Sequence, residues 1–299
     1  MKRLPQIGLL PDSKRLHLQD GPIDLIVEAE GSGSHVRAAY EAAGRRFTGL
    51  LDELCEELTE LRKAAESGRT ALKAVVARRM HAAVAPFASG CFVTPMAAVA
   101  GSVAEEILGA MTAAARLDRT YVNNGGDIAL HLAEGKHFKV GLTDRPDSQG
   151  LMRIVIIGAD DPIRGVATSG RHGRSFSLGI ADAVTVLAKT ASQADAAATI
   201  IANAVDLPGH PAIVRLPANE LQPDSDLGAR LVTREVGALS ESEVELALEA
   251  GADCARRCLA AGLVERAVLR LHGETALVEP RDIGSRPLQE RRLKGIMHA

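Results

Sequence analysis

The sequence has few aromatic residues and no tryptophan. Two tyrosines and five phenylalanines are the whole aromatic content of its 299 residues. Platforms that stack the bases of single-stranded nucleic acids, and cages that hold organic cations, need several exposed aromatic rings. The composition therefore argues against both kinds of site.

An excess of either charge is also lacking. The chain has 35 Lys and Arg residues against 38 Asp and Glu residues, which gives a formal net charge of −3. Binding to a polyphosphate backbone or to an anionic membrane depends on a marked excess of positive charge. We therefore expect no nucleic-acid partner and no membrane partner, while a local basic pocket stays compatible with the composition.

Cysteine is scarce as well. The four cysteines, Cys55, Cys91, Cys254 and Cys258, are too few and too scattered for a disulfide framework, and no C-x-x-C pair suggests a zinc site. Cys254 and Cys258 lie one helical turn apart, which fits either a thiol pair or, more commonly, a small apolar helix face. No apolar run of the kind that a signal peptide needs follows Met1–Pro5. We expect a cytoplasmic protein.

Short apolar runs bounded by Gly, Asp and Pro predict strands along most of the chain. The expected strands are two or three within 4–30, then 119–122, 128–132, 138–142, 153–157, 165–168, 182–187, 212–216, 230–236, 266–271 and 275–278. Because they follow one another in meanders, we expect an α+β fold with a largely antiparallel sheet. No change of composition divides residues 1–280, so we expect one domain there, followed by a basic C-terminal tail over 281–299.

Helices are expected between these strands. Apolar residues at three-four spacing predict a long helix from Val36 to Leu61, and further helices are expected over 95–116, 192–205 and 240–261. The apolar seam of the first helix would suit pairing with a second subunit, although packing on the chain's own sheet is the commoner outcome. A homo-oligomer is therefore among the expected partners.

Three polar clusters between residues 123 and 199 are candidates for a binding site. The first, Asn123-Asn124-Gly125-Gly126-Asp127, lies between two predicted strands. This composition is typical of a tight hairpin turn, because Asn and Gly accept positive φ at little cost. In the functional interpretation, the glycines let a ligand approach the backbone, while Asn123 and Asp127 supply oxygens for a ribose or a ring edge.

The second cluster is Thr168-Ser169-Gly170-Arg171-His172-Gly173-Arg174-Ser175, directly after a predicted strand. Small residues expose backbone N–H groups, and Arg171 and Arg174 add fixed positive charge, which together suit a diphosphate. A plain turn between two strands explains the same composition. The cluster alone does not separate these two interpretations.

The third cluster is Ala194-Asp195-Ala196-Ala197-Ala198-Thr199. Asp195 and Thr199 are four residues apart, so on a helix their oxygens share one face and suit a hard cation such as Mg²⁺. As an alternative, Ser192 and Asp195 have the spacing of a capping box, in which Asp195 only caps its own helix. That alternative leaves the Thr199 hydroxyl unexplained.

Together, the three clusters resemble the core motifs of a known enzyme family. Val122-Asn-x-Gly-Gly-Asp127, Ala167-Thr-Ser-Gly170 and Ala194-Asp-Ala-x-x-Thr199 occur in the same order as the motifs of the ApbE-like FAD:protein FMN transferases. Residues 21–25, 121–130 and 173–185 resemble more closely an uncharacterised family of bacterial and archaeal proteins related to those transferases, and this likeness covers nearly the whole chain.

The resemblance implies the ApbE-like T-fold, in which an antiparallel sheet carries long packed helices. It also implies FAD or FMN as the cofactor, with Mg²⁺ at the diphosphate bound by Asp195 and Thr199, which are then the catalytic pair. FMN would pass from FAD to a hydroxyl of an acceptor protein, while metal and basic groups neutralise the charge developing on the phosphates. The residues expected to contact the cofactor are Asn123, Gly125, Gly126, Asp127, Thr168, Ser169, Gly170, Arg171 and Arg174.

Two stretches depart from the transferase pattern. Where the transferases carry His-x-x-x-Asp-Pro-x-Thr-Gly, this chain has Phe176-Ser-Leu-Gly179, and their Lys-Gly pair is Ala100-Gly101 here. A second hypothesis therefore stays open, in which the cleft belongs to a small-molecule enzyme or binding module and holds a purine-, pterin- or pyridine-like ring without diphosphate chemistry. Asn123, Asp127 and Ser169 would then contact the ring.

Overall fold

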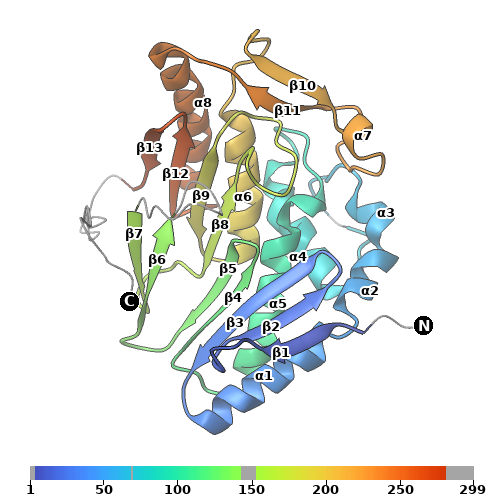
Figure 1. The fold of residues 1–299 in the computed structure, drawn as a ribbon, viewed down its shortest axis with the longest axis vertical. Coiled ribbons are helices and arrows are strands. Elements are labelled where there is room, and N and C mark those ends of the chain that lie inside the picture. Colours follow the sequence, from blue (N-terminus) through green and yellow to red (C-terminus); the bar gives the residue numbers. More distant parts are fainter. Residues whose placement is uncertain (1–3, 69, 143–152, 281–299) are drawn as a thin grey trace.

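One nine-stranded antiparallel sheet runs through the molecule (Figure 1). The computed structural model describes residues 4–68, 70–142 and 153–280. In spatial order the strands are β1 (Gln6–Leu9), β2 (Leu16–Asp20), β3 (Ile23–Glu30), β4 (Arg119–Asn124), β5 (Asp127–Leu132), β8 (Gly165–Ser169), β9 (Ala183–Ala188), β12 (Arg266–Leu271) and β13 (Glu274–Val278). Neighbouring strands pair antiparallel, which confirms the predicted α+β class.

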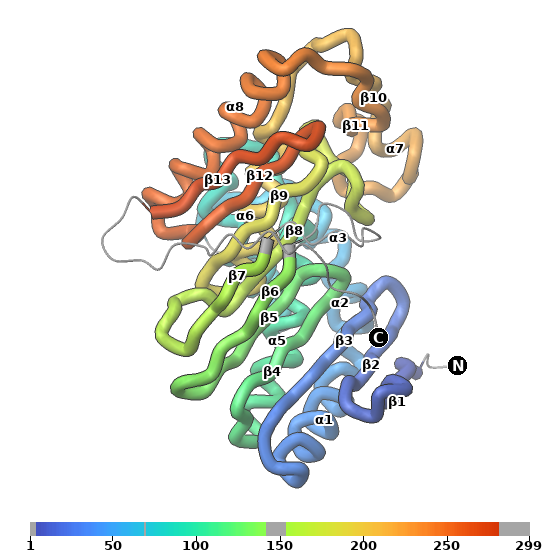
Figure 2. Tube along the Cα trace, turned by 60° about the vertical axis from the view of Figure 1, so that its left-hand side comes forward, coloured from blue at the N-terminus to red at the C-terminus, as the bar shows by residue number. Residues whose placement is uncertain are grey.

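Helices cover one face of this sheet, and a hairpin lies against the other (Figures 1 and 2). The longer helices are α1 (Gly33–Phe47), α4 (Val75–Val84), α5 (Val99–Ala114), α6 (Ala191–Ala204) and α8 (Glu241–Ala260). The hairpin of β6 (His137–Leu142) and β7 (Arg153–Gly158) packs Val155 and Ile157 against Leu130 and Leu187 of the main sheet. The hydrophobic core therefore has two parts, one on each face of the main sheet, and the larger part lies between the sheet and the helices.

The helix predicted from Val36 to Leu61 is divided into three pieces. It ends at Phe47, and α2 (Leu50–Glu56) and α3 (Leu58–Leu61) follow after Gly49, which has φ +87°. A left-handed residue cannot continue a right-handed helix, which explains the break. Leu50, Leu54 and Leu61 are buried in the chain's own core, so this part of the seam packs internally.

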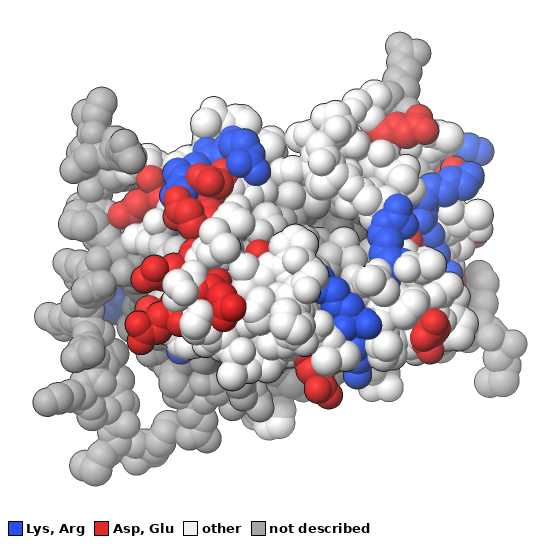
Figure 3. Space-filling view, turned by 90° about the horizontal axis from the view of Figure 1, so that it is seen from above, with Lys and Arg blue, Asp and Glu red and all other residues white. Residues whose placement is uncertain are grey.

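A small arm lies at one end of the molecule. It consists of β10 (Ile213–Pro217), α7 (Ala218–Leu221) and β11 (Leu231–Val236), with the first and last paired antiparallel. Figure 3 views this end and shows charged side chains of both signs, some of them adjoining, with uncharged surface between the charged groups. The predicted tail over 281–299 lies outside the described residues.

The stretch Pro95–Ala114 is long and apolar enough to cross a membrane by length and composition alone, with a mean hydropathy of 1.2. It forms the 3₁₀ turn Pro95–Ala98 and helix α5, which packs on β4 and β5 and contacts α1, α4 and α6. Val103, Ala104, Ile107 and Met111 are buried in that packing. The apolar side chains of α5 therefore belong to the core between the sheet and the helices.

Glycines allow the backbones of α5 and α6 to touch. A Cβ at Gly101 would lie 2.3 Å from the carbonyl oxygen of Ala191, and one at Gly165 would lie 2.1 Å from that of Thr190. Real Cβ atoms do not approach so closely, so both positions require glycine. These contacts bring the first turn of α6 against the first turn of α5 and the start of β8.

Candidate functional site

The three polar clusters of the sequence meet where β5, β8, α5 and α6 converge. Asp127, the first residue of β5, accepts a hydrogen bond from the backbone N–H of Thr168 in β8, at 3.3 Å. The charge of Asp127 also acts on Asp195 of α6, so the two carboxyl groups are neighbours. Arg174 reaches the hairpin turn, where its Nη1 would lie 3.8 Å from a Cβ at Gly125.

Asp195 caps a helix other than its own. Its Oδ2 accepts from the backbone N–H of Gly101 at 2.9 Å, and the backbone of Ala100 also donates to it. Helix α5 has no side-chain cap from its own N-cap residue, Ala98, so Asp195 satisfies donors at that end.

Helix α6 obtains its own cap elsewhere, so the predicted capping box of Ser192 and Asp195 is wrong. The N-cap residue is Thr190, whose side chain accepts from the N–H of Gln193. The N–H and the hydroxyl of Ser192 both donate to Glu105 of α5, at 2.7 and 2.8 Å. The carboxylate of Asp195 is thereby left to face α5 and Asp127.

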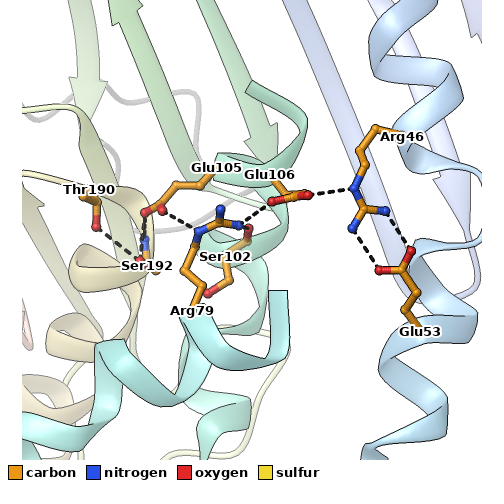
Figure 4. A network of polar contacts seen from close by, with 8 residues as sticks. All are labelled: Arg46, Glu53, Arg79, Ser102, Glu105, Glu106, Thr190 and Ser192. Carbon is orange, nitrogen blue, oxygen red and sulfur yellow. Dashed lines mark hydrogen bonds and ion pairs between the residues drawn. The ribbon is translucent and has the colours of Figure 1, made fainter. Parts of the chain in front are cut away.

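A network of ion pairs holds α5 and α6 in this position (Figure 4). Arg79 of α4 lies between Glu105 at 3.1 Å and Glu106 at 2.9 Å. Arg46 of α1 contacts Glu106 at 2.7 Å and Glu53 at 2.9 Å. Because Glu105 also binds the first turn of α6, the network fixes Asp195 relative to α5.

Two neighbouring carboxyl groups in a partly buried place resist ionisation. Burial raises the pKa of Asp127 to about 7. Burial, with the nearby charge of Asp127, raises the pKa of Asp195 well above its usual range. Both side chains keep partial solvent exposure, and within the described part of the chain no Lys or Arg forms an ion pair with either. A proton or a cation would relieve this repulsion.

The raised pKa of Asp127 predicts a pH-dependent stability. Between its ordinary value of 3.8 and about 7 the folded state holds a proton that the unfolded chain has lost. Stability therefore falls as the pH rises through this window, by about 2 kcal/mol between pH 5 and 7.5. We expect Asp127→Asn to reduce this slope in denaturant unfolding, leaving the part that the raised pKa of Asp195 contributes, whereas Asp253→Asn, on the exposed face of α8, should keep the whole slope. Equal slopes in all three proteins would contradict the assignment.

The first cluster is the hairpin turn between β4 and β5, as its composition predicts. The side chain of Asn123 accepts from the N–H of Gly126 at 2.8 Å, and Gly125 and Gly126 have φ +65° and +113°. Asn124, a member of this cluster for which no role was expected, donates to the carbonyl of Ala100 at 3.2 Å and ties the turn to α5. Asn123 therefore serves the turn itself, and Asp127 is the member that faces α6.

The two arginines of the second cluster have different surroundings. Arg171 donates to the carboxylate of Asp182 from Nε at 2.9 Å and from Nη2 at 2.6 Å. Asp182, unremarkable in the sequence, thus neutralises one of the two predicted cations. Arg174 is exposed and forms no ion pair with any residue that the structure describes. It is the cation available to an anionic ligand.

The remaining predicted residues lie around the same place. The hydroxyl of Thr168 contacts that of Thr185 at 2.9 Å across β8 and β9, and the half-buried Ser169 is the last residue of β8. Gly170 has φ +152°, and a Cβ there would lie 2.5 Å from the carbonyl oxygen of Asp182. Thr199 is half-buried on α6, one turn after Asp195.

No group of three or more His, Cys, Asp or Glu side chains that could hold a metal occurs among the described residues. A divalent cation here would therefore rely on few carboxylates. All the atoms here that could bind a metal are oxygens. They belong to the carboxyl groups of Asp127 and Asp195, which form no ion pair with a described Lys or Arg, and to the hydroxyl of Thr199. Hard cations such as Mg²⁺ accept this set when water completes the shell. The residues fit such an ion.

Comparisons with known proteins agree with this architecture. A UPF0280 protein of Methanopyrus kandleri is 41% identical over 129 residues, covering 43% of this chain and 48% of the relative. A UPF0280 protein of Methanosphaerula palustris is 39% identical over 145 residues, covering 44% and 52%. The chain thus spans about half the length of the curated relatives it matches.

A solved structure shares the fold. The apo form of the flavinyl transferase ApbE of Pseudomonas stutzeri superposes with a TM-score of 0.50 at 12% identity, over 92% of this chain and 95% of that one. The large antiparallel sheet with packed helices is therefore ApbE-like, as the motifs predicted. The model of the family described as AbpE bacteria matches residues 7–277, and the chain belongs to that family.

Proposed function

We propose that this protein binds a flavin nucleotide between the β4–β5 turn, the end of β8 and the first turns of α6, and that it transfers FMN from FAD to a protein hydroxyl. The family and the fold relate the chain to the flavin transferases. The observation that carries the proposal is the neighbouring pair of carboxyl groups of Asp127 and Asp195, with which no described Lys or Arg forms an ion pair, together with the exposed Arg174 at the adjoining β4–β5 turn.

In the proposed reaction the oxygen of the acceptor hydroxyl attacks the phosphorus nearer the flavin, the phosphoanhydride bond breaks, AMP leaves, and the proton of the hydroxyl passes to water. Asp195 and Thr199, with Asp127 beside them, would hold Mg²⁺, which neutralises charge on the diphosphate when bound. Arg174 would donate charge-assisted hydrogen bonds to the same phosphates. Asp182 keeps Arg171 in the loop and so positions Arg174.

One observation favours the second candidate, a binding module or small-molecule enzyme for a planar heterocycle. With Arg171 neutralised by Asp182, Arg174 is the one arginine of the second cluster that forms no ion pair with a described residue. A ring without phosphates would need no more than the oxygens of Asp127 and Ser169. An acceptor protein and a cytoplasmic location belong to the first candidate and stay predictions.

The test is incubation of the purified protein with FAD and Mg²⁺, followed by measurement of retained flavin and released AMP. We expect retained FAD and slow AMP release. Arg174→Ala should weaken FAD binding about 10-fold or more, because a charge-assisted hydrogen bond is lost, and should leave riboflavin binding unchanged. Arg256→Ala, on the exposed face of α8, is the matched control. Riboflavin retention with no FAD preference and no AMP would favour the second candidate, and no flavin retention would exclude FMN transfer.

A further inference from the structure

The outer strand of the sheet, β1, carries two core-facing side chains that the described part of the chain leaves about half exposed. Ile7 pairs with Leu18 and Leu9 with Leu16, so both side chains lie on the helix-side face of the sheet. Their strand partners are buried, yet Ile7 is 45% exposed and Leu9 is 59% exposed. Helix α1 stops short of them, although Ile7 touches its edge at Gly44. Figure 2 shows β1 at the margin of the sheet.

A groove of about 1090 Å³ occupies the space that is left between β1 and α1. Its floor is Ile7, Leu9 and Leu16, and its wall is the side of α1 that carries Val36 and Tyr40. It lies away from Asp127 and Asp195, neither of which lines it. Exposed apolar side chains beside an unpaired sheet edge form a surface that can pair with another strand.

We propose that a second copy of this chain occupies the groove, by antiparallel pairing of the two β1 strands about a two-fold axis. Strand β1, Gln-Ile-Gly-Leu, carries no charge that would oppose pairing with itself. A register centred on Gly8 places Ile7 of one copy opposite Leu9 of the other. The sheet would continue through the dimer, and the four apolar side chains would be covered between the two α1 helices.

The charges along the groove are self-complementary. Arg37, Glu41 and Arg45 follow one another at one-turn intervals on the exposed side of α1 and line the groove. Two antiparallel α1 helices can therefore oppose Glu41 of one copy to Arg45 of the other. Pro5 and Pro11 bracket the strand and lack the N–H needed to extend the pairing. Each copy offers this edge once, so the assembly closes at two.

Sedimentation velocity over a concentration series tests the proposal. We expect a dimer, and Ile7→Lys or Leu9→Lys should weaken it at least ~10-fold, because a charge would be buried in the seam. Leu246→Lys is the matched control, since Leu246 is 65% exposed on α8, outside the groove. A monomer at every concentration, or a dimer that Ile7→Lys leaves intact, would overturn the proposal.

A cross-link checks the register independently of affinity. Opposed residues in an antiparallel pair have Cα atoms about 5 Å apart, within the range of a disulfide. A Cβ at Gly8 would meet nothing within 4 Å, so Gly8→Cys should be tolerated. With Cys55 and Cys91 replaced by serine, copper phenanthroline and air should link two copies through Gly8→Cys and leave Gly109→Cys, on the open side of α5, unlinked. Equal linking of both variants would refute the register.

Discussion

Asp195→Asn is expected to abolish Mg²⁺-dependent FAD binding while the protein stays folded. The amide oxygen of asparagine can still accept from the N–H of Gly101, so the cap on α5 survives. The negative charge is lost, and with it the attraction for a divalent cation. Loss of groups that merely support a metal ligand costs 10–100-fold in affinity, so loss of a ligand should weaken Mg²⁺ binding by at least ~100-fold. Titration calorimetry with Mg²⁺ and FAD measures this.

The stability of the same variant separates the functional role of Asp195 from a structural one. Burial disfavours the ionised form of this carboxyl group, so a neutral amide should leave the free energy of unfolding unchanged or raise it. Asp195→Ala should lose both ligand binding and part of the cap, which costs about 1 kcal/mol. Asp253→Asn serves as the control. If Asp195→Asn binds FAD and Mg²⁺ as the native protein does, Asp195 is a cap and no metal ligand.

Gly101→Ala is expected to cause a large loss of stability. Alanine normally favours a helix over glycine by about 1 kcal/mol. Here the new methyl would lie 2.3 Å from the Ala191 carbonyl oxygen and 2.9 Å from the Ser192 nitrogen, both backbone atoms. The two helices would have to separate, which breaks their shared packing. We expect the free energy of unfolding to fall by about 3 kcal/mol, measured by denaturant unfolding.

Gly109→Ala in the same helix provides the matched control. A Cβ at Gly109 would meet nothing within 4 Å, and the residue is exposed. This variant should gain about 0.5–1 kcal/mol from helix propensity and lower backbone entropy of the unfolded chain. Equal effects of the two substitutions would mean that α5 and α6 do not touch as described. Because Gly101 also donates to Asp195, the large loss should be accompanied by weaker ligand binding.

The strand and helix pattern was largely readable from the sequence, because it depends on local periodicity and turn residues. The strands after residue 118 and the helices over 192–205 and 240–261 agree with the structure to within a residue or two. One exception is α4, which no pattern in the sequence predicted. Another is the helix predicted from Val36 to Leu61, whose apolar spacing continues through the breaks. The short helices that follow Gly49 pack on the same core as α1, so their apolar residues keep the same spacing. Periodicity alone therefore could not show that Gly49 is left-handed and ends the first helix.

The residue types and their order along the chain were enough to identify the candidate segments of the site. These are a glycine turn that ends in Asp127, a loop of small residues with Arg171 and Arg174, and a helix that carries Asp195. Tertiary structure alone decided their roles. In the folded chain Arg171 pairs with Asp182, Arg174 is exposed, and Asp195 caps the N-terminal end of α5. Charge and capping are properties of neighbours in space, and here those neighbours stand 11 and 94 residues away along the chain.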